Sequence, residues 1–368
     1  MTRALACAAA TLLSATAPAD EATPAPPRVS LHGFVDVYDA LNLNEPSDGN
    51  NFTPGTGTSG KRAEAVTVNL AAIDLSADAA PVGFHLALGF GTSAEVVHEG
   101  EATDAEVPGR DLWRHVLNAS VSYLAPLGSG LLLEGGVYTS HIGLEELASK
   151  DNWTYTRSWM GELSPYYQAG VKAAYKLSDH LSAQLHLLNG WQAISRPGVR
   201  LGESLGTQLE YKTERVDVLL NTFEGPFFGA ADGQRWFVDA VAEVQATPVL
   251  GLALTADAGV LRAPDGSWLF WRAAALLARI GLGARSDIAF RLEAFDDPAG
   301  AASGTPQTLT EGTFTLDVRP APALILKAEA RYDRSTARVF GGASDPTRSI
   351  PSTRADQVLG ILGAVATF

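Results

Sequence analysis

Two neighbouring stretches indicate the fold of this chain: QRWFVDAVAEVQA at residues 234–246 and LGLALTADAGV at residues 250–260. In both, apolar side chains alternate with polar or small ones, the pattern of β-strands whose two faces meet different surroundings. They are 13 and 11 residues long, whereas soluble strands average about five or six. A strand that crosses a membrane at a tilt needs about nine to eleven residues. The length therefore favours transmembrane strands.

The same alternation recurs along the chain, and the connections between the repeats differ in length. Short connections follow the even-numbered strands and long ones follow the odd-numbered strands, as in bacterial outer-membrane barrels. The sequence therefore predicts an all-β, transmembrane, antiparallel up-and-down β-barrel of about 16 strands (14–18), with short periplasmic turns and long external loops. The predicted strands cover residues 29–43, 63–78, 82–92, 113–124, 131–138, 166–177, 181–191, 203–211, 216–223, 234–246, 250–260, 268–280, 287–295, 307–318, 323–332 and 357–368.

The composition excludes several classes of protein. The 368 residues include a single Cys and are 18% charged, with a net charge of -14. One Cys excludes a disulfide scaffold or a multi-cysteine metal site, and the acidic balance argues against nucleic acid as a partner. No apolar run long enough for a transmembrane helix lies beyond the N-terminus, which argues against a helical membrane protein.

The N-terminal residues look like an export signal. Arg3 precedes a short apolar run, and Ala17-Pro18-Ala19 supplies a cleavage pattern typical of secretory signals. We expect residues 1–19 to be a signal peptide, residues 20–28 a Pro-rich periplasmic lead-in, and residues 29–368 the barrel. An Ala-rich helix at residues 4–15 is the alternative. Export and the predicted strands together place the chain in the bacterial outer membrane, in contact with lipid and lipopolysaccharide.

The predicted barrel encloses a lumen lined by polar side chains. Sixteen strands leave room for water, whereas side chains fill an eight-stranded barrel. Charges of both signs on such a wall orient polar solutes and set ion preference. In a soluble sandwich the same residues would form the solvated outer face. The candidates for lining the lumen are Arg114, Lys172, Asp239, Glu243, Arg291, Glu293, Lys327 and Arg331.

These features predict passive diffusion of small polar solutes or ions, with no cofactor and no bound metal. H-E-x-x-H does not occur, and G-x-S-x-G occurs at residues 202–206, where a strand begins. The hydrolase motif instead needs a turn from a strand into a helix, so we expect no enzymatic activity. Two other functions stay open: a non-conducting barrel that acts as an adhesin or receptor, and an outer-membrane hydrolase.

Several motifs resemble those of the OmpL-like β-barrel porin family. They are Gly33-Phe-Val-Asp-Val-Tyr38, Trp153-Thr-Tyr-Thr-Arg157-Ser158, Ser164-Pro-Tyr-Tyr-Gln-Ala-Gly170 and Asn189-Gly190-Trp191. The resemblance implies an outer-membrane channel. Whether the channel is a monomer or a homotrimer stays open. It also implies that Phe368, which ends an alternating strand, is recognised by the barrel-insertion machinery.

The resemblance further implies a role for residues 139–165, the third predicted external loop. In sixteen-stranded porins this loop folds inward and narrows the lumen. We therefore expect Glu145, Glu146 and Arg157 to approach a pore constriction. An ordinary solvated loop is the alternative.

Overall fold

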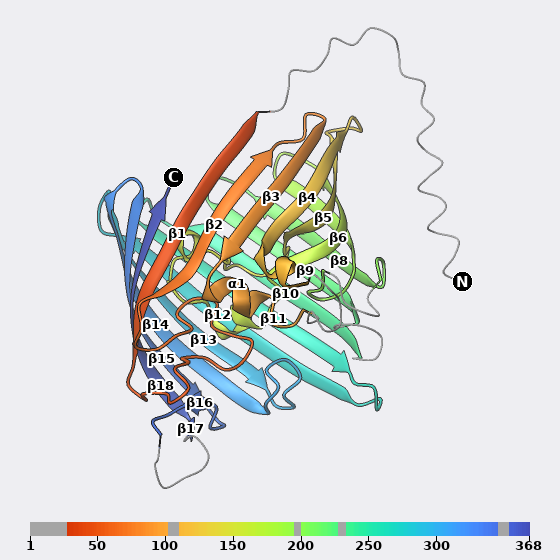
Figure 1. The fold of residues 1–368 in the computed structure, drawn as a ribbon. Helices are drawn as coiled ribbons and strands as arrows, with labels where there is room; N and C mark the ends of the chain where they lie inside the picture. The colour runs from red at the N-terminus through yellow and green to blue at the C-terminus, as the bar shows by residue number, and fades with distance from the viewer. Residues whose placement is uncertain (1–27, 102–109, 195–199, 227–232, 345–352) are drawn as a thin grey trace, which may run out of the picture.

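Sixteen antiparallel strands form one closed barrel in the computed structural model, which describes residues 28–101, 110–194, 200–226, 233–344 and 353–368 (Figure 1). The predicted fold class is confirmed. The strands are β1 (Val29–Asn42), β2 (Thr67–Ala77), β3 (Val82–Phe90), β4 (Val116–Ala125), β5 (Leu131–Thr139), β6 (Tyr167–Lys176), β7 (Leu181–Leu188), β8 (Ser204–Lys212), β9 (Val216–Pro226), β10 (Gln234–Gln245), β11 (Leu250–Arg262), β12 (Trp268–Gly281), β13 (Ser286–Asp297), β14 (Gln307–Ala321), β15 (Leu324–Ser335) and β18 (Asp356–Thr367).

The barrel closes where the first strand meets the last. β1 pairs with β2 on one side and with β18 on the other, with Val35 opposite Ala366. At the end of this seam the Phe368 N–H donates to the Gly33 carbonyl at 2.9 Å, and the Gly33 N–H donates back at 3.1 Å. Closure leaves no strand edge unpaired, as a lipid environment requires.

The short and long connections lie at opposite ends of the barrel. The tight turns share the upper end in Figure 1 with the start of β1 and the end of β18, and the long loops occupy the lower end. The long loops hold a small hairpin and short helices, none of which in the described chain is long and apolar enough to cross a membrane. These elements are β16 (Phe340–Gly341), β17 (Thr353–Arg354), α1 (Thr92–Val97), α2 (Trp159–Glu162) and the 3-10 turns η1 (Arg110–His115) and η2 (Ser149–Asp151).

The sheet is apolar on its outer face and polar on its inner face, the reverse of a soluble protein. Large apolar side chains such as Leu254, Leu276 and Leu362 are exposed on the outer face. Charged side chains such as Arg291 and Asp333 are buried inside. Soluble monomers rarely expose continuous apolar surface, so the outer face is suited to lipid. The predicted signal peptide at residues 1–19 lies outside the described residues.

A charge placed on the outer face tests this assignment. Leu362 lies in the middle of β18 and is 66% exposed. We expect Leu362→Arg to lower the free energy of unfolding by about 2–4 kcal/mol, the cost of Arg at the middle of a bilayer. Denaturant titration of protein folded into phospholipid vesicles measures the change.

The matched control is Leu127→Arg. Leu127 lies in a short turn outside the strands and is 58% exposed, so the new charge stays in water and little change is expected. Equal stability of the two variants would contradict a lipid-covered outer face.

Candidate functional site

The connection between β5 and β6, which we name loop 140–166, lies inside the barrel. The Gly143 N–H donates to Asp239 Oδ2 of β10 at 3.0 Å, and the Tyr155 hydroxyl donates to Asp36 Oδ1 of β1 at 2.9 Å. The Tyr155 N–H donates to Glu329 of β15 at 2.5 Å. The loop thus contacts inward side chains of strands that are far apart around the ring.

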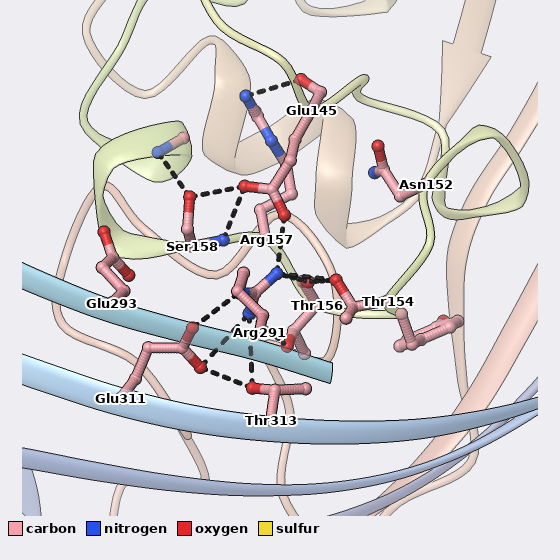
Figure 2. Close-up of polar contacts among 12 residues, drawn as sticks. Glu145, Asn152, Thr154, Thr156, Arg157, Ser158, Arg291, Glu293, Glu311 and Thr313 are labelled. Carbon is pink, nitrogen blue, oxygen red and sulfur yellow. Dashed lines mark hydrogen bonds and ion pairs between the residues drawn. The ribbon is translucent and has the colours of Figure 1, made fainter. Parts of the chain in front are cut away.

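Arg291 of β13 is the centre of the contact between the loop and the wall (Figure 2). Its guanidinium is fully buried and lies 2.6 Å from Glu145 Oε1 of the loop and 2.6 Å from Glu311 Oε1 of β14. It also donates to Thr154 Oγ1 and to the Thr156 carbonyl, each at 2.6 Å. A guanidinium carries five N–H donors in a planar fork, and here that fork joins the loop to two strands.

Carboxylates of the wall bind the backbone of the same loop. Glu293 accepts hydrogen bonds from the N–H groups of Trp159 and Met160 at 2.7 and 2.6 Å. These groups begin α2, where a helix leaves its first N–H groups without partners. Before the helix, Glu329 accepts a hydrogen bond from the Thr156 N–H at 3.1 Å. The wall therefore supplies hydrogen bonds that the loop backbone lacks.

Two further cations of β15 complete this set of contacts. Arg331 donates to the Arg157 carbonyl at 2.5 Å and to Asp333 at 2.9 Å. Lys327 donates to the Asn152 carbonyl at 2.5 Å. Both side chains are almost completely buried. Buried ionic groups are tolerated only when they are paired and hydrogen-bonded, so the loop and these strands depend on each other.

The three loop residues predicted to approach a constriction fall into two groups. Glu145 is buried and also accepts from the Ser158 N–H at 2.9 Å. Burial opposes its ionisation, but the Arg291 and Arg157 guanidinium groups hold the pKa of Glu145 below its usual value. Arg157 is 2% exposed and lies over the Tyr166 ring, 4.3 Å from its centroid. Glu145 therefore joins the loop to Arg291 of the wall, and Arg157 packs within the loop.

Glu146 differs from its neighbour. Its side chain is exposed and lines an open cavity, and in the described chain its carboxylate has no hydrogen bond or ion pair. Protein nevertheless surrounds it, and burial raises the pKa of its carboxyl. Of the three, Glu146 is therefore the residue that a solute in the lumen can meet.

The predicted lumen residues are spread over three environments. Asp239, Arg291, Glu293, Lys327 and Arg331 are buried beneath loop 140–166. Lys172 of β6 and Glu243 of β10 are only partly buried, and Lys172 pairs with Glu134 at 2.8 Å. Arg114 lies outside the strands because β4 begins at Val116 and not at residue 113 as predicted. It is exposed in η1 and lines a cavity at the loop end of the barrel.

Some residues of the site were not predicted. Glu311 and Asp333 pair with Arg291 and Arg331, and Glu162 accepts hydrogen bonds from the N–H groups of Gly57 and Thr58. The period-two alternation in their strands places Glu311 and Asp333 on the inner face, so that signal could have found them. Glu162 lies in an irregular loop and had no such signal.

Charged and polar side chains line the candidate site. In the part of the chain that the structure describes, no group of three His, Cys, Asp or Glu side chains could hold a metal ion. Open space remains on both sides of loop 140–166: a cavity of about 560 Å³ against β1 to β4, and one of about 200 Å³ beside Trp153, Lys212 and Glu243. The charges beside these spaces can orient polar solutes and ions.

Solved structures with the same fold are outer-membrane proteins. The anion-selective porin from Comamonas acidovorans is 12% identical, with a TM-score of 0.60 over 93% of this chain and 100% of its own. The outer membrane channel DcaP of Acinetobacter baumannii is 13% identical, with a TM-score of 0.59 over 92% and 97%. OmpT of Vibrio cholerae in its trimer form is 10% identical, with a TM-score of 0.55 over 93% and 99%.

Sequence comparison identifies the family. No curated protein matches this chain. The family model described as "Putative beta-barrel porin-2, OmpL-like" matches residues 28–368, which include the whole barrel. The chain therefore belongs to the OmpL-like β-barrel porin family.

Proposed function

We propose that small polar solutes and ions diffuse passively through this barrel and that loop 140–166 narrows their route. Family membership makes the chain an outer-membrane porin, and the loop contacts support the finer proposal. The observation that carries it is the attachment of the loop to Arg291, Glu293 and Glu329 inside the barrel. A loop held by buried charges occupies part of the lumen permanently.

Partly accessible charges on β5, β6, β8 and β9 support a role in sorting solutes by charge. Lys172 pairs with Glu134 at 2.8 Å, and Lys212 contacts both Glu210 and Asp217. Charges of opposite sign close together produce a local field that orients a dipolar solute. Glu243 lines the cavity of about 200 Å³ together with Lys212 and Asp217, without an ion pair in the described chain. Acidic groups exceed basic ones here, which favours cations.

The remaining features complete the proposal. Residues 1–19 direct export as a signal peptide, and Phe368 engages the barrel-insertion machinery. The outer face contacts lipid and lipopolysaccharide. The trimer form of OmpT supports a homotrimer for this chain. Family and fold point to a channel without enzymatic activity; an adhesin or receptor would be a barrel that conducts no ions.

Bilayer recording tests the proposed function directly. Purified protein added to a planar lipid bilayer should produce stepwise increases in conductance, because each inserted barrel opens a water-filled route. Swelling of loaded liposomes in sugars of increasing size should then give the size limit. Inserted protein that stays electrically silent would contradict the porin proposal and favour the receptor.

A substitution at Gly363 can disturb the packing of loop 140–166 against the barrel wall. A Cβ atom at Gly363 would lie 2.4 Å from Cε2 of Tyr155, which is completely buried. We expect Gly363→Val to displace the loop, at a cost of about 1–3 kcal/mol for overpacking, and to increase single-channel conductance.

The control is the same substitution three residues earlier. A Cβ atom at Gly360 meets nothing within 4 Å, and this residue lies on the opposite face of β18. Gly360→Val should therefore conduct like the unmodified protein. Unchanged conductance in Gly363→Val, with folding intact, would argue against narrowing by the loop.

We expect acid to weaken the contact between the beginning of loop 140–166 and the barrel wall. The His141 ring stacks on His186 of β7, with centroids 4.1 Å apart, and Lys172 of β6 is the nearby cation. Burial lowers the pKa of His141 from its usual 6.5 to about 4. Between pH 4 and 6.5, His141 takes up a proton when the loop is displaced but not when the loop is bound to the barrel wall. Binding of the loop to the wall is therefore stable above pH 6.5 and weakens as the pH falls towards 4.

Protease susceptibility of the loop measures this effect. Cleavage within loop 140–166 should increase as the pH falls from about 6.5 to 4, with an acid-tolerant protease. His141→Phe keeps the aromatic stacking and removes the titrating group, so it should flatten the response in this window. An identical pH profile in the variant would assign the response to other groups.

A further inference from the structure

The cavity of about 560 Å³ lies on the side of loop 140–166 away from Arg291. Its walls are the inner faces of β1 to β4 and loop residues 146–151. Its lining reaches His32 and Thr367, near the short-turn end of the barrel. Ligand cavities in proteins commonly measure about 300–1,000 Å³, so this space could hold a small organic molecule.

One part of this cavity, which we name the floor, is apolar, whereas the wall that binds loop 140–166 around Arg291 is charged. Aliphatic and aromatic side chains or alanine methyl groups occupy inward positions where a porin wall would otherwise present polar groups to water. Such a floor favours a solute with an apolar body, because contact removes apolar surface from water. The floor consists of Phe34, Leu70, Ala72, Ala87, Leu117 and Leu147.

Acidic groups dominate the polar part of the lining. Glu146 has no ion pair in the described chain, Asp74 Oδ2 lies 2.5 Å from His85 Nε2, and Asp151 binds Lys150. The lining thus holds three carboxylates, one ammonium and the two imidazoles of His32 and His85. Carboxylates outnumber the ammonium group three to one.

The chain itself shows how a cation is accommodated here. The Lys150 ammonium donates to both Asp151 oxygens at 2.8 and 2.7 Å and lies 5.3 Å from the centroid of the Phe34 ring. A carboxylate and a ring face together are a favourable environment for an ammonium group. Glu146 lines the same cavity without any such partner, so one carboxylate beside the apolar floor is available to a second cation.

We propose that this cavity binds a small organic cation with an apolar body, such as an aryl-alkyl ammonium ion. The ammonium group pairs with Glu146, and the apolar body lies on the floor between Phe34 and Leu117. The site would favour such cations among permeating solutes, a role that rests on the proposed function. Binding itself needs only the folded barrel.

Calorimetry on the folded full-length protein in detergent tests the proposal. The probe is 2-phenylethylammonium, compared at pH 7 with 2-phenylethanol and phenylacetate, which share its body and differ in charge. We expect the ammonium ion to bind more tightly than either. Glu146→Gln should weaken its binding roughly tenfold, the value of one charge-assisted contact. Equal or tighter binding of phenylacetate would overturn the proposal.

Two further variants separate the site from general effects. Ala87→Leu fills the floor and should abolish binding while the barrel stays folded, as judged by its heat-dependent mobility in gels. Glu99→Gln is the matched control, because Glu99 lies in a cavity near the long loops that Glu146 does not line. Binding unchanged in both Glu146→Gln and Ala87→Leu would place the probe elsewhere and refute the site.

Bilayer recording distinguishes this proposal from the porin function. A silent barrel that still binds the ammonium ion through Glu146 would refute the channel and leave the site standing. A conducting barrel that does not bind the ammonium ion would refute the site and leave the channel standing.

Discussion

The structure depends on the need to hydrogen-bond every backbone group of a strand that crosses lipid. Unpaired N–H and C=O groups cost several kcal/mol each in hydrocarbon, so a sheet must close on itself. Here β18 closes the ring by pairing with both β1 and β15. Once the ring is closed, each strand has one face towards lipid and one towards the lumen. The alternation of apolar and polar residues follows from that geometry.

Charges inside the ring create a second requirement. Removing an ion from water costs several kcal/mol, which is regained only through good pairing and hydrogen bonds. Arg291, Arg331 and Lys327 are completely or almost completely buried, and loop 140–166 supplies carboxylate, hydroxyl or carbonyl partners to each of them. Removing one partner of such a set leaves an uncompensated charge. The loop is therefore part of the barrel interior and not a flexible appendage.

The loop divides the lumen into regions of different chemistry. Its contacts with β13 to β15 are ionic and exclude solvent, whereas the cavity against β1 to β4 combines an apolar floor with Glu146. The wall that carries Lys172 and Glu243 is polar and accessible. A solute that enters the barrel therefore meets different surfaces on the two sides of one loop.

Much of the architecture could be predicted from sequence because strand periodicity and turn spacing are local. The predicted strand at residues 250–260 matches β11 closely, whereas β2 begins at Thr67 and not at residue 63, because the chain there stays in an irregular loop. The alternation also places Arg291 and Glu293 on the inner face. Their partners in the loop could not be predicted, because Glu145 is 146 residues away from Arg291 in the chain.

Repeated local patterns were enough to predict a closed barrel of about sixteen strands and the inward position of most of its charged residues. Only the tertiary structure decided which charges meet water. Glu145 and Glu146 are adjacent in sequence, yet one is bound to Arg291 and the other faces an open cavity. The irregular path of loop 140–166 sets that difference, and this path depends on long-range contacts with strands that precede it and strands that follow it in the chain.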